Sequence, residues 1–128
     1  MLTFPKGLYG FEEATKFLFV PTPEASLPFF YLVCLDVEDL QFVVTNPFYF
    51  IENYDFELAD TTAEALDIKG LEDVSIYNLV VILDDVNNTT INLKAPLVIN
   101  HREMKGAQLI LKEDYAYKHL LFTKEGDV

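Results

Sequence analysis

Carboxylates are the most concentrated side chains in this sequence that could do chemistry. Between Asp36 and Asp73 eleven acidic residues face a single basic one, Lys69, so this segment carries −10 of the chain's net charge of −12. The eleven are Asp36, Glu38, Asp39, Glu52, Asp55, Glu57, Asp60, Glu64, Asp67, Glu72 and Asp73. Such a segment can form a solvated face that favours solubility. It can also form a docking face for a basic protein, because complementary charge speeds encounter.

The other reactive residue types form no recognisable constellation. His101 and His119 have no neighbouring Cys, His or carboxylate in a metal-binding spacing. The sequence has no glycine-rich phosphate loop and no Gly-x-Ser-x-Gly elbow, and Ser26 and Ser75 have no obvious histidine partner. Paired carboxylates can serve a glycosidase, but no Trp is present to stack on a sugar. We therefore predict a protein that is not an enzyme and uses no metal or cofactor.

Length and composition favour one folded domain over residues 1–128, with a frayed tail at about 121–128. The chain is 51% hydrophobic, and its net charge of −12 opposes direct binding to nucleic acid. Cys34, the single cysteine, lies in an apolar run and is expected to be a buried small hydrophobe. The sequence shows neither a signal peptide nor an apolar run of about 18 residues, so we expect a cytoplasmic protein with no membrane partner.

Short hydrophobic runs separated by turn signals predict an antiparallel β structure. Strands are expected at 16–20, 29–35 and 40–45, and the last two should form a hairpin across Asp36–Asp39. Further strands are expected at 74–83, 90–95, 97–100 and 107–111, with a turn over 102–106. Both faces of 74–83 are largely apolar, so both should be covered. The predicted fold is mainly β, a small antiparallel barrel-like domain with one short helix.

That helix is expected over Asp60–Leu66, because Thr61 followed by Glu64 has the form of a capping box. The stretch before the first strand is interrupted by prolines and glycines. It is therefore expected to be a loop, anchored by Phe4 and Phe11.

Five blocks of the sequence, in order, resemble the FliW family of flagellar assembly factors. They are Phe4–Glu12, the stretch from Phe30 to Phe48, Tyr54–Leu58, Thr90–Asn100 and Gly106–Leu111. The first reads Phe-Pro-Lys-Gly-Leu-Tyr-Gly-Phe-Glu and is similar to the family's Phe-Pro-x-Gly-Leu-x-Gly-Phe-Glu opening. Many members carry a strand before this block, whereas only Met1–Thr3 precede it here. The first sheet edge is therefore expected to be either shorter or filled differently.

The resemblance implies a compact barrel-like β fold and a protein-binding role in the bacterial cytoplasm. Family members bind flagellin and the RNA-binding translational regulator CsrA. By holding CsrA off its messenger RNA, they couple flagellin synthesis to flagellin export. The acidic segment agrees with this independently, because a protein that binds RNA must present basic residues to phosphate.

Candidate partner-binding residues come from the acidic segment and from the resembling blocks. They are Asp36, Glu38, Asp39, Asn46, Pro47, Phe48, Asp55, Glu57 and Asn92. The first three lie in a predicted turn and are expected to be solvated. Asn46 and Pro47 also suit a turn that has only a structural role. The alternation of residues 90–95 directs Asn92 to the outside of the sheet.

Two other classes of function stay open. The aromatic residues could line the pocket of a small-molecule-binding β-barrel, which a large closed apolar cavity would favour. An enzyme would need two carboxyl groups about 5 to 10 Å apart in a cleft. A filled barrel with an acidic outer face would favour the protein binder.

Overall fold

The computed structural model describes residues 1–21 and 28–122, so the predicted tail from residue 123 onward lies outside the described residues. Its strands are β1 (Leu2–Thr3), β2 (Lys16–Pro21), β3 (Phe29–Cys34), β4 (Gln41–Thr45), β5 (Val74–Val81), β6 (Thr90–Ile91), β7 (Leu97–Asn100), β8 (Lys105–Gln108) and β9 (His119–Leu120). Its helices are α1 (Asp60–Ala65) and three 3-10 turns, η1 (Pro47–Tyr49), η2 (Leu71–Asp73) and η3 (Val86–Asn88).

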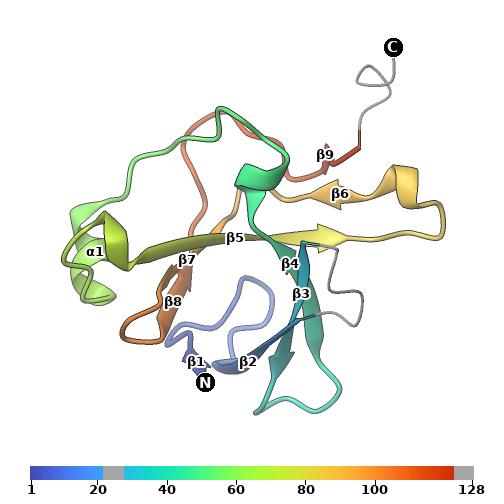
Figure 1. Ribbon diagram of the computed structural model, residues 1–128. Coiled ribbons are helices and arrows are strands. Elements are labelled where there is room, and N and C mark those ends of the chain that lie inside the picture. Colours follow the sequence, from blue (N-terminus) through green and yellow to red (C-terminus); the bar gives the residue numbers. More distant parts are fainter. Residues whose placement is uncertain (22–27, 123–128) are drawn as a thin grey trace.

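A closed ring of strands forms the body of the protein (Figure 1). The order around the ring is β4-β3-β2-β1-β8-β7-β5, and β5 pairs back onto β4 with Val80 opposite Val43. β6 and β9 extend the sheet beyond β5. Neighbouring strands run antiparallel except β1 and β8, which are parallel with Thr3 opposite Lys105. The prediction of a mainly β, barrel-like fold with one short helix is confirmed.

Two hydrophobic cores lie on opposite faces of the barrel wall. The inner core joins the barrel strands to the loop before β2, and its fully buried members include Phe4, Phe17, Leu32 and Leu97. The outer core lies against β4 and β5, beneath the segments that follow η1 and β8. Its buried members are Phe29, Tyr54, Val80, Ile91, Leu93, Leu111 and Leu121. The barrel interior is therefore filled with side chains.

Strand β5 belongs to both cores, as its two apolar faces predict. Tyr77 and Leu79 pack against the inner core, and Ile76 and Val80 belong to the outer core. The strand ends at Val81 instead of residue 83, because its pairing with β6 stops there and the next two side chains are exposed.

Strands β2, β3, β4 and β7 lie where the sequence predicts them, and β3 and β4 form the expected hairpin. Asp39 in its turn has a φ of 61°, a left-handed conformation that Asp tolerates better than most residues. Cys34 is buried at the end of β3, as predicted.

The run predicted as one strand over 90–95 is a strand only at Thr90–Ile91. Asn92 N–H still donates to Leu79 O of β5 at 2.9 Å, but the N–H groups of Leu93 and Lys94 both donate to Ala116 O, so the ladder to β5 ends there. The predicted alternation of burial still holds, because the inward members of the run, Ile91, Leu93 and Ala95, are all buried.

The strand predicted at 107–111 begins at Lys105, inside the expected turn. Met104 adopts a φ of 58° and closes the turn from β7 in fewer residues than expected. The ladder continues past Gln108, because Leu109 N–H donates to Pro96 O at 3.0 Å and Leu111 N–H to Lys94 O at 2.9 Å.

Two short strands were not predicted. β1 pairs with β2 and β8, within the stretch expected to be a loop. Phe4 anchors this stretch as expected, whereas Phe11 is 38% exposed and packs edge-on against Phe42. β9 pairs with β6, and the adjacent Leu121 is buried with its N–H donating to Thr89 O at 3.0 Å. The frayed tail therefore does not begin at residue 121.

The capping box predicted for the helix is wrong. Helix α1 begins at Asp60 after the N-cap residue Ala59, which makes no side-chain capping bond, so Thr61 lies inside the helix. Asp60 places a carboxylate in the first turn, where the helix dipole favours negative charge.

Ion pairs beyond the helix tie η2 to the turn between β7 and β8. The Arg102 guanidinium lies against Asp73, with Nε 3.1 Å from Oδ1 and Nη2 3.1 Å from Oδ2. The backbone N–H of Lys69 adds a hydrogen bond of 3.0 Å to Asp73 Oδ2. These contacts, with Arg102 the largest, lower the pKa of Asp73 to about 2.

The low pKa of Asp73 predicts a specific acid sensitivity. Its pKa in the unfolded chain is about 3.9, above the folded value of about 2. Its contribution to stability is therefore fully present above about pH 4 and is lost as the pH falls through about 2. Asp73→Asn should make the unfolding free energy fall less steeply between those two pH values than in the wild type. Urea denaturation across this range checks it, with Asp84→Asn as the control, and equal slopes would contradict it.

Gly106 is a second position with a testable prediction, because the structure leaves no room there for a side chain. A Cβ at this position would lie 2.6 Å from Cζ of Phe4, whose side chain is fully buried in the inner core. Gly106→Ala should therefore lower the unfolding free energy by about 1–3 kcal/mol through overpacking. Gly10→Ala is the comparison for a glycine with open space around it, although its φ of 86° adds backbone strain. Chemical denaturation measures both, and an unchanged Gly106→Ala variant would contradict the argument.

Candidate functional site

Three consecutive candidate residues, Asn46, Pro47 and Phe48, form the capped start of the 3-10 helix η1. Asn46 caps η1, with its Oδ1 accepting the N–H of Phe48 at 2.9 Å, and Pro47 is buried at the first helical position. This turn directs the next two side chains outward, and Phe48 is 53% exposed while Tyr49 is 68% exposed. Asn46 and Pro47 therefore have a structural role, and the surface they build is aromatic.

Phe48 forms one wall of a groove of about 170 Å³ that we call the apolar groove. Its lining comes from η1, the segment 54–58, η2, β5 and β7: Phe48, Tyr54, Asp55, Phe56, Leu58, Leu71, Val74, Ile76 and Val98. Leu71 is 88% exposed, an unusual position for a large apolar side chain. Asp55, another candidate, is the one charged residue of this lining.

The wall of the apolar groove is held rigidly. Tyr54 OH donates to Leu93 O at 2.6 Å and accepts from Asn78 Nδ2 at 3.1 Å. Burial raises the pKa of Tyr54 to about 12, so the hydroxyl stays protonated and keeps donating. Tyr115 OH accepts the N–H of Asp55 at 3.0 Å and donates to Asp55 O at 2.8 Å. These bonds fix the segment 54–58 as a preformed wall.

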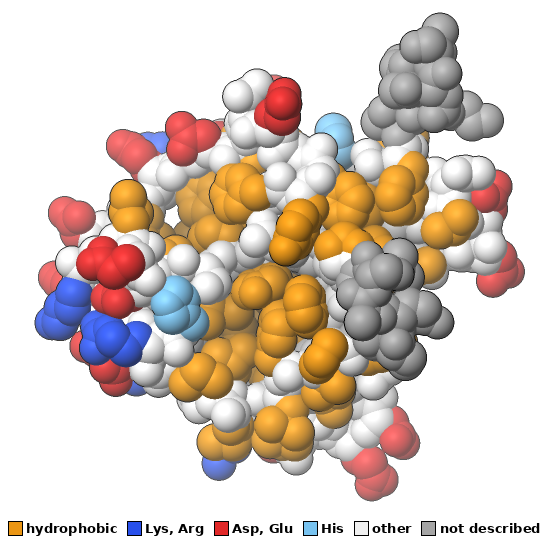
Figure 2. Space-filling model, viewed as in Figure 1, with side chains coloured by type: hydrophobic (Ala, Val, Ile, Leu, Met, Phe, Trp, Pro, Cys, Tyr) orange, Lys and Arg blue, Asp and Glu red, His pale blue; other side chains and the backbone are white. Residues whose placement is uncertain are grey.

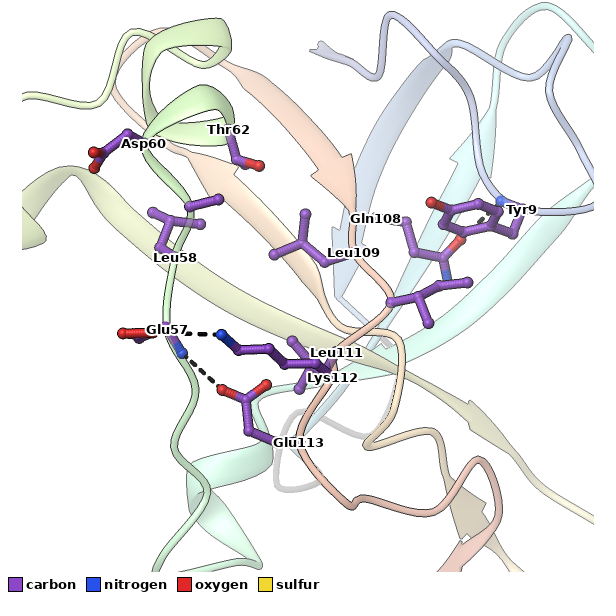
Figure 3. A pocket seen from close by; sticks show the side chains of 12 residues that line it. Tyr9, Glu57, Leu58, Asp60, Thr62, Gln108, Leu109, Leu111, Lys112 and Glu113 are labelled. Carbon is purple, nitrogen blue, oxygen red and sulfur yellow. Dashed lines mark hydrogen bonds and ion pairs between the residues drawn. The ribbon is translucent and has the colours of Figure 1, made fainter.

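A larger groove of about 560 Å³, here called the edge groove, lies between residues 57–62 and 108–113, with Tyr9 at one end (Figure 3). At its closed end Glu113 Oε2 accepts the N–H of Glu57 at 3.1 Å, and Lys112 Nζ lies 3.7 Å from Glu57 Oε1. Hydrogen bonds from its own N–H and that of Glu57 lower the pKa of Glu113.

Asp36 is exposed, as the sequence predicts, but its carboxylate is also anchored by hydrogen bonds. Its carboxylate accepts the Thr15 hydroxyl at 2.7 Å, and Cys34 Sγ lies 3.0 Å from Oδ1. Hydrogen bonds from Cys34 first and Thr15 next hold the pKa of this carboxyl well below its usual range. Asp36 therefore ties the β3–β4 turn to the start of β2, a role that the local sequence does not reveal.

The acidic candidates do not gather on one face. Glu38 and Asp39 are exposed on the β3–β4 turn, whereas α1 lies at a different end of the molecule (Figure 1). Asp55 lines the apolar groove and Glu57 the edge groove, and the two grooves share Leu58. Figure 2 shows hydrophobic side chains gathered across the middle of one face, over β2 and β5, with Asp and Glu around its rim.

Asn92 is half-buried, and its side chain has a local role. Its Oδ1 accepts the N–H of Ala95 at 3.0 Å and closes the turn after β6. Its backbone oxygen accepts Asn78 Nδ2 at 2.7 Å, and the same amide donates to Tyr54 OH in the wall of the apolar groove.

Sequence reasoning missed a serine–histidine contact. Ser75 Oγ lies 2.8 Å from His101 Nδ1, because Ser75 pairs with Ile99 across β5 and β7 and His101 follows two residues later. Sequence reasoning also missed Leu71, for which the only sequence signal is an apolar residue between Gly70 and two carboxylates.

Across residues 1–21 and 28–122, no group of three or more His, Cys, Asp or Glu side chains could hold a metal ion. In the same part of the chain, no helix is long and apolar enough to cross a membrane.

Comparison with known proteins decides the family. The model of the FliW protein family matches residues 1–121. The chain belongs to the FliW family. The flagellar assembly factor FliW of Clostridium kluyveri is 41% identical over 126 residues, covering 98% of this chain and 86% of that protein. FliW of Alkaliphilus metalliredigens is 38% identical over 125 residues, covering 97% and 77%, and FliW of Bacillus subtilis is 36% identical over 120 residues, covering 93% and 83%.

The crystal structure of a flagellar assembly factor FliW has the same fold. It superposes with a TM-score of 0.88 at 36% sequence identity, covering 95% of this chain and 85% of that one. The resemblance seen in the five sequence blocks is therefore confirmed.

Proposed function

We propose that this protein is a flagellar assembly factor that acts in the bacterial cytoplasm by binding a CsrA-type RNA-binding regulator and flagellin. By holding the regulator off its messenger RNA, it couples flagellin synthesis to export. The observation that carries the proposal is the preformed apolar groove between Phe48 and Leu71 in a chain of the FliW family. Exposed large apolar residues beside a groove are typical of protein-docking sites.

Calorimetry with the purified regulator and purified flagellin from the same organism tests the proposal. Heat of binding with both partners is expected, and no heat with either would refute it. This protein alone should not bind RNA, because its net charge of −12 repels phosphate. Adding it to a regulator–RNA complex should release the RNA in a gel-shift assay, and a stable complex of this protein with bare RNA would also contradict the proposal.

The two alternative classes receive less support from the described residues. The barrel interior is packed with side chains, and the hollow lined by Phe19, Tyr77 and Met104 holds only about 160 Å³, below the roughly 300 Å³ of small-molecule sites. The edge groove reaches that volume, but three carboxylates line it, so it is not a closed apolar cavity. A glycosidase needs one carboxyl group with a raised pKa. In the edge groove, which contains three carboxylates, the pKa of Glu113 is lowered instead.

Charge on the β3–β4 turn tests electrostatic steering of the regulator. Asp36 must be left intact because of its contacts with Thr15 and Cys34. Glu38→Gln with Asp39→Asn should slow association and flatten its salt dependence while stability stays within about 0.5 kcal/mol. Stopped-flow association at low and high salt measures this. The control is Asp84→Asn with Asp114→Asn, which removes equal charge elsewhere, and identical rates for the two double variants would reject steering by this turn.

A further inference from the structure

In the part of the chain that the structure describes, no strand pairs with the outer edge of residues 108–112, which forms one wall of the edge groove. The N–H groups of Leu109 and Leu111 donate into the sheet, to Pro96 O and Lys94 O. Because a strand alternates, the N–H and C=O groups of Gln108, Ile110 and Lys112 point the other way, toward the groove. Within the described residues, the outward N–H and C=O groups of these three residues make no backbone hydrogen bond.

The strand that would cover this edge stops short of it. β1 runs parallel to β8, but their pairing is limited to Thr3 opposite Lys105. The chain then turns inward, with Phe4 N–H donating to Thr15 O at 2.7 Å. The chain comes back to this edge at Tyr9, but there it bonds only a side chain. Tyr9 N–H donates to Gln108 Oε1 at 2.8 Å. The edge from Gln108 to Lys112 spans about 13 Å at the rise of a β-strand.

The opposite wall does not close the gap with a ladder. The two walls are joined at one end by side chains, through Glu113 to Glu57 N–H and through Lys112 to Glu57. Beyond that end, Leu58 and Leu109 lie on opposite walls, and Thr62 of α1 lies above the open space (Figure 3). The space of about 560 Å³ is left open along the free edge.

The side chains around the edge groove define the chemistry of an occupant. Glu57, Asp60 and Glu113 contribute three negative charges against the single positive charge of Lys112. Ile110, 50% exposed, and Tyr9, 57% exposed, offer apolar contact. A segment with apolar residues beside Lys or Arg fits this surface. A second copy of the chain does not, because each carries a net charge of −12.

We propose that the edge Gln108–Lys112 takes up an extended, basic segment of the RNA-binding regulator by β-strand addition. Main-chain hydrogen bonds supply affinity in this binding mode, and side-chain pockets supply specificity. The inference rests on the proposed function, because the regulator supplies the added strand. It extends that function by naming where the regulator binds and in which geometry.

Hydrogen exchange of the intact protein, with and without saturating regulator, gives a distinctive signature. The amides of Gln108, Ile110 and Lys112 should gain protection of at least about tenfold on binding, while those of Leu109 and Leu111 are already bonded within the sheet. Docking through side chains alone would not produce this alternation.

A backbone variant tests the same point independently. Ile110→Pro removes an outward N–H without breaking a recorded internal hydrogen bond, and should weaken regulator binding by about tenfold or more. Ile110→Ala keeps the N–H and is the matched control, with an expected loss of less than about threefold. Thermal melting checks the fold of each variant, and exchange on the wild type decides the matter if Ile110→Pro does not fold.

Each outcome has a definite meaning. Regulator binding with no new protection at the three amides, or a well-folded Ile110→Pro variant that binds normally, overturns this inference and leaves the proposed function standing. Protection that appears with flagellin alone, or with rising concentration of this protein alone, overturns the assignment to the regulator. A wild-type protein that does not bind the regulator overturns the proposed function and this inference with it.

Discussion

Asn100→Ala should cost the protein about 3–5 kcal/mol of unfolding free energy, a large share of the stability of a domain this size. The Asn100 side chain is fully buried and makes four hydrogen bonds. Its Nδ2 donates to Leu66 O at 2.8 Å and Asp67 O at 3.1 Å, and its Oδ1 accepts the N–H groups of Arg102 at 3.0 Å and Glu103 at 3.1 Å. Alanine would leave buried backbone groups unpaired on both the helix and the turn.

Urea denaturation monitored by circular dichroism measures this loss. Asn92→Ala is the matched control, because Asn92 is only half-buried and its side chain makes the one recorded bond to Ala95 N–H. That variant should lose about 1 kcal/mol. If both variants lose the same amount, Asn100 is not the junction between α1 and the β7–β8 turn that its contacts indicate.

Phe48→Ala combined with Leu71→Ala should weaken binding of a protein partner at the apolar groove by roughly a thousandfold. A large apolar side chain at the centre of an interface commonly contributes about 2 kcal/mol, and two such losses correspond to that factor. Because Phe48 is 53% and Leu71 88% exposed, the unfolding free energy should change by less than about 1 kcal/mol.

Calorimetry with each partner measures the affinities separately and shows which partner uses the apolar groove. Leu18→Ala with Tyr117→Ala is the control, since these side chains are 43% and 54% exposed and lie outside both grooves. A folded double variant at Phe48 and Leu71 that binds both partners normally would show that neither docks at the apolar groove.

The sequence predicts the strands that carry their own signal. β3 and β4 are runs of aromatic and β-branched residues bounded by turns, and they lie where expected. β1 and β9 are two residues each and exist only through their partners, Phe17 and Lys105 for β1 and the β6 residues for β9. Strand propensity cannot identify strands of that length. The closure of the strand ring therefore could not be predicted from the local sequence.

The candidate site was predictable to a similar degree. The Asn46–Pro47 turn and the nearby Phe48 follow from local chemistry and from the resemblance to the family. The anchoring of Asp36 depends on Thr15, which lies 21 residues earlier in the chain. Leu71 is exposed because of how η2 is placed on the fold. That placement leaves no pattern in the neighbouring sequence.

The pairing of Thr3 with Lys105 has a consequence for synthesis of the chain. The barrel can close only after residue 105 has left the ribosome, roughly a hundred residues after its first strand emerged. At about 5–20 residues per second, that takes roughly 5–20 seconds. Once β4 has emerged, the nascent β2–β3–β4 sheet keeps an open edge beside β2 for the rest of that interval. An emerging chain with such an edge is exposed to wrong pairing and to capture by chaperones until its last barrel strand arrives.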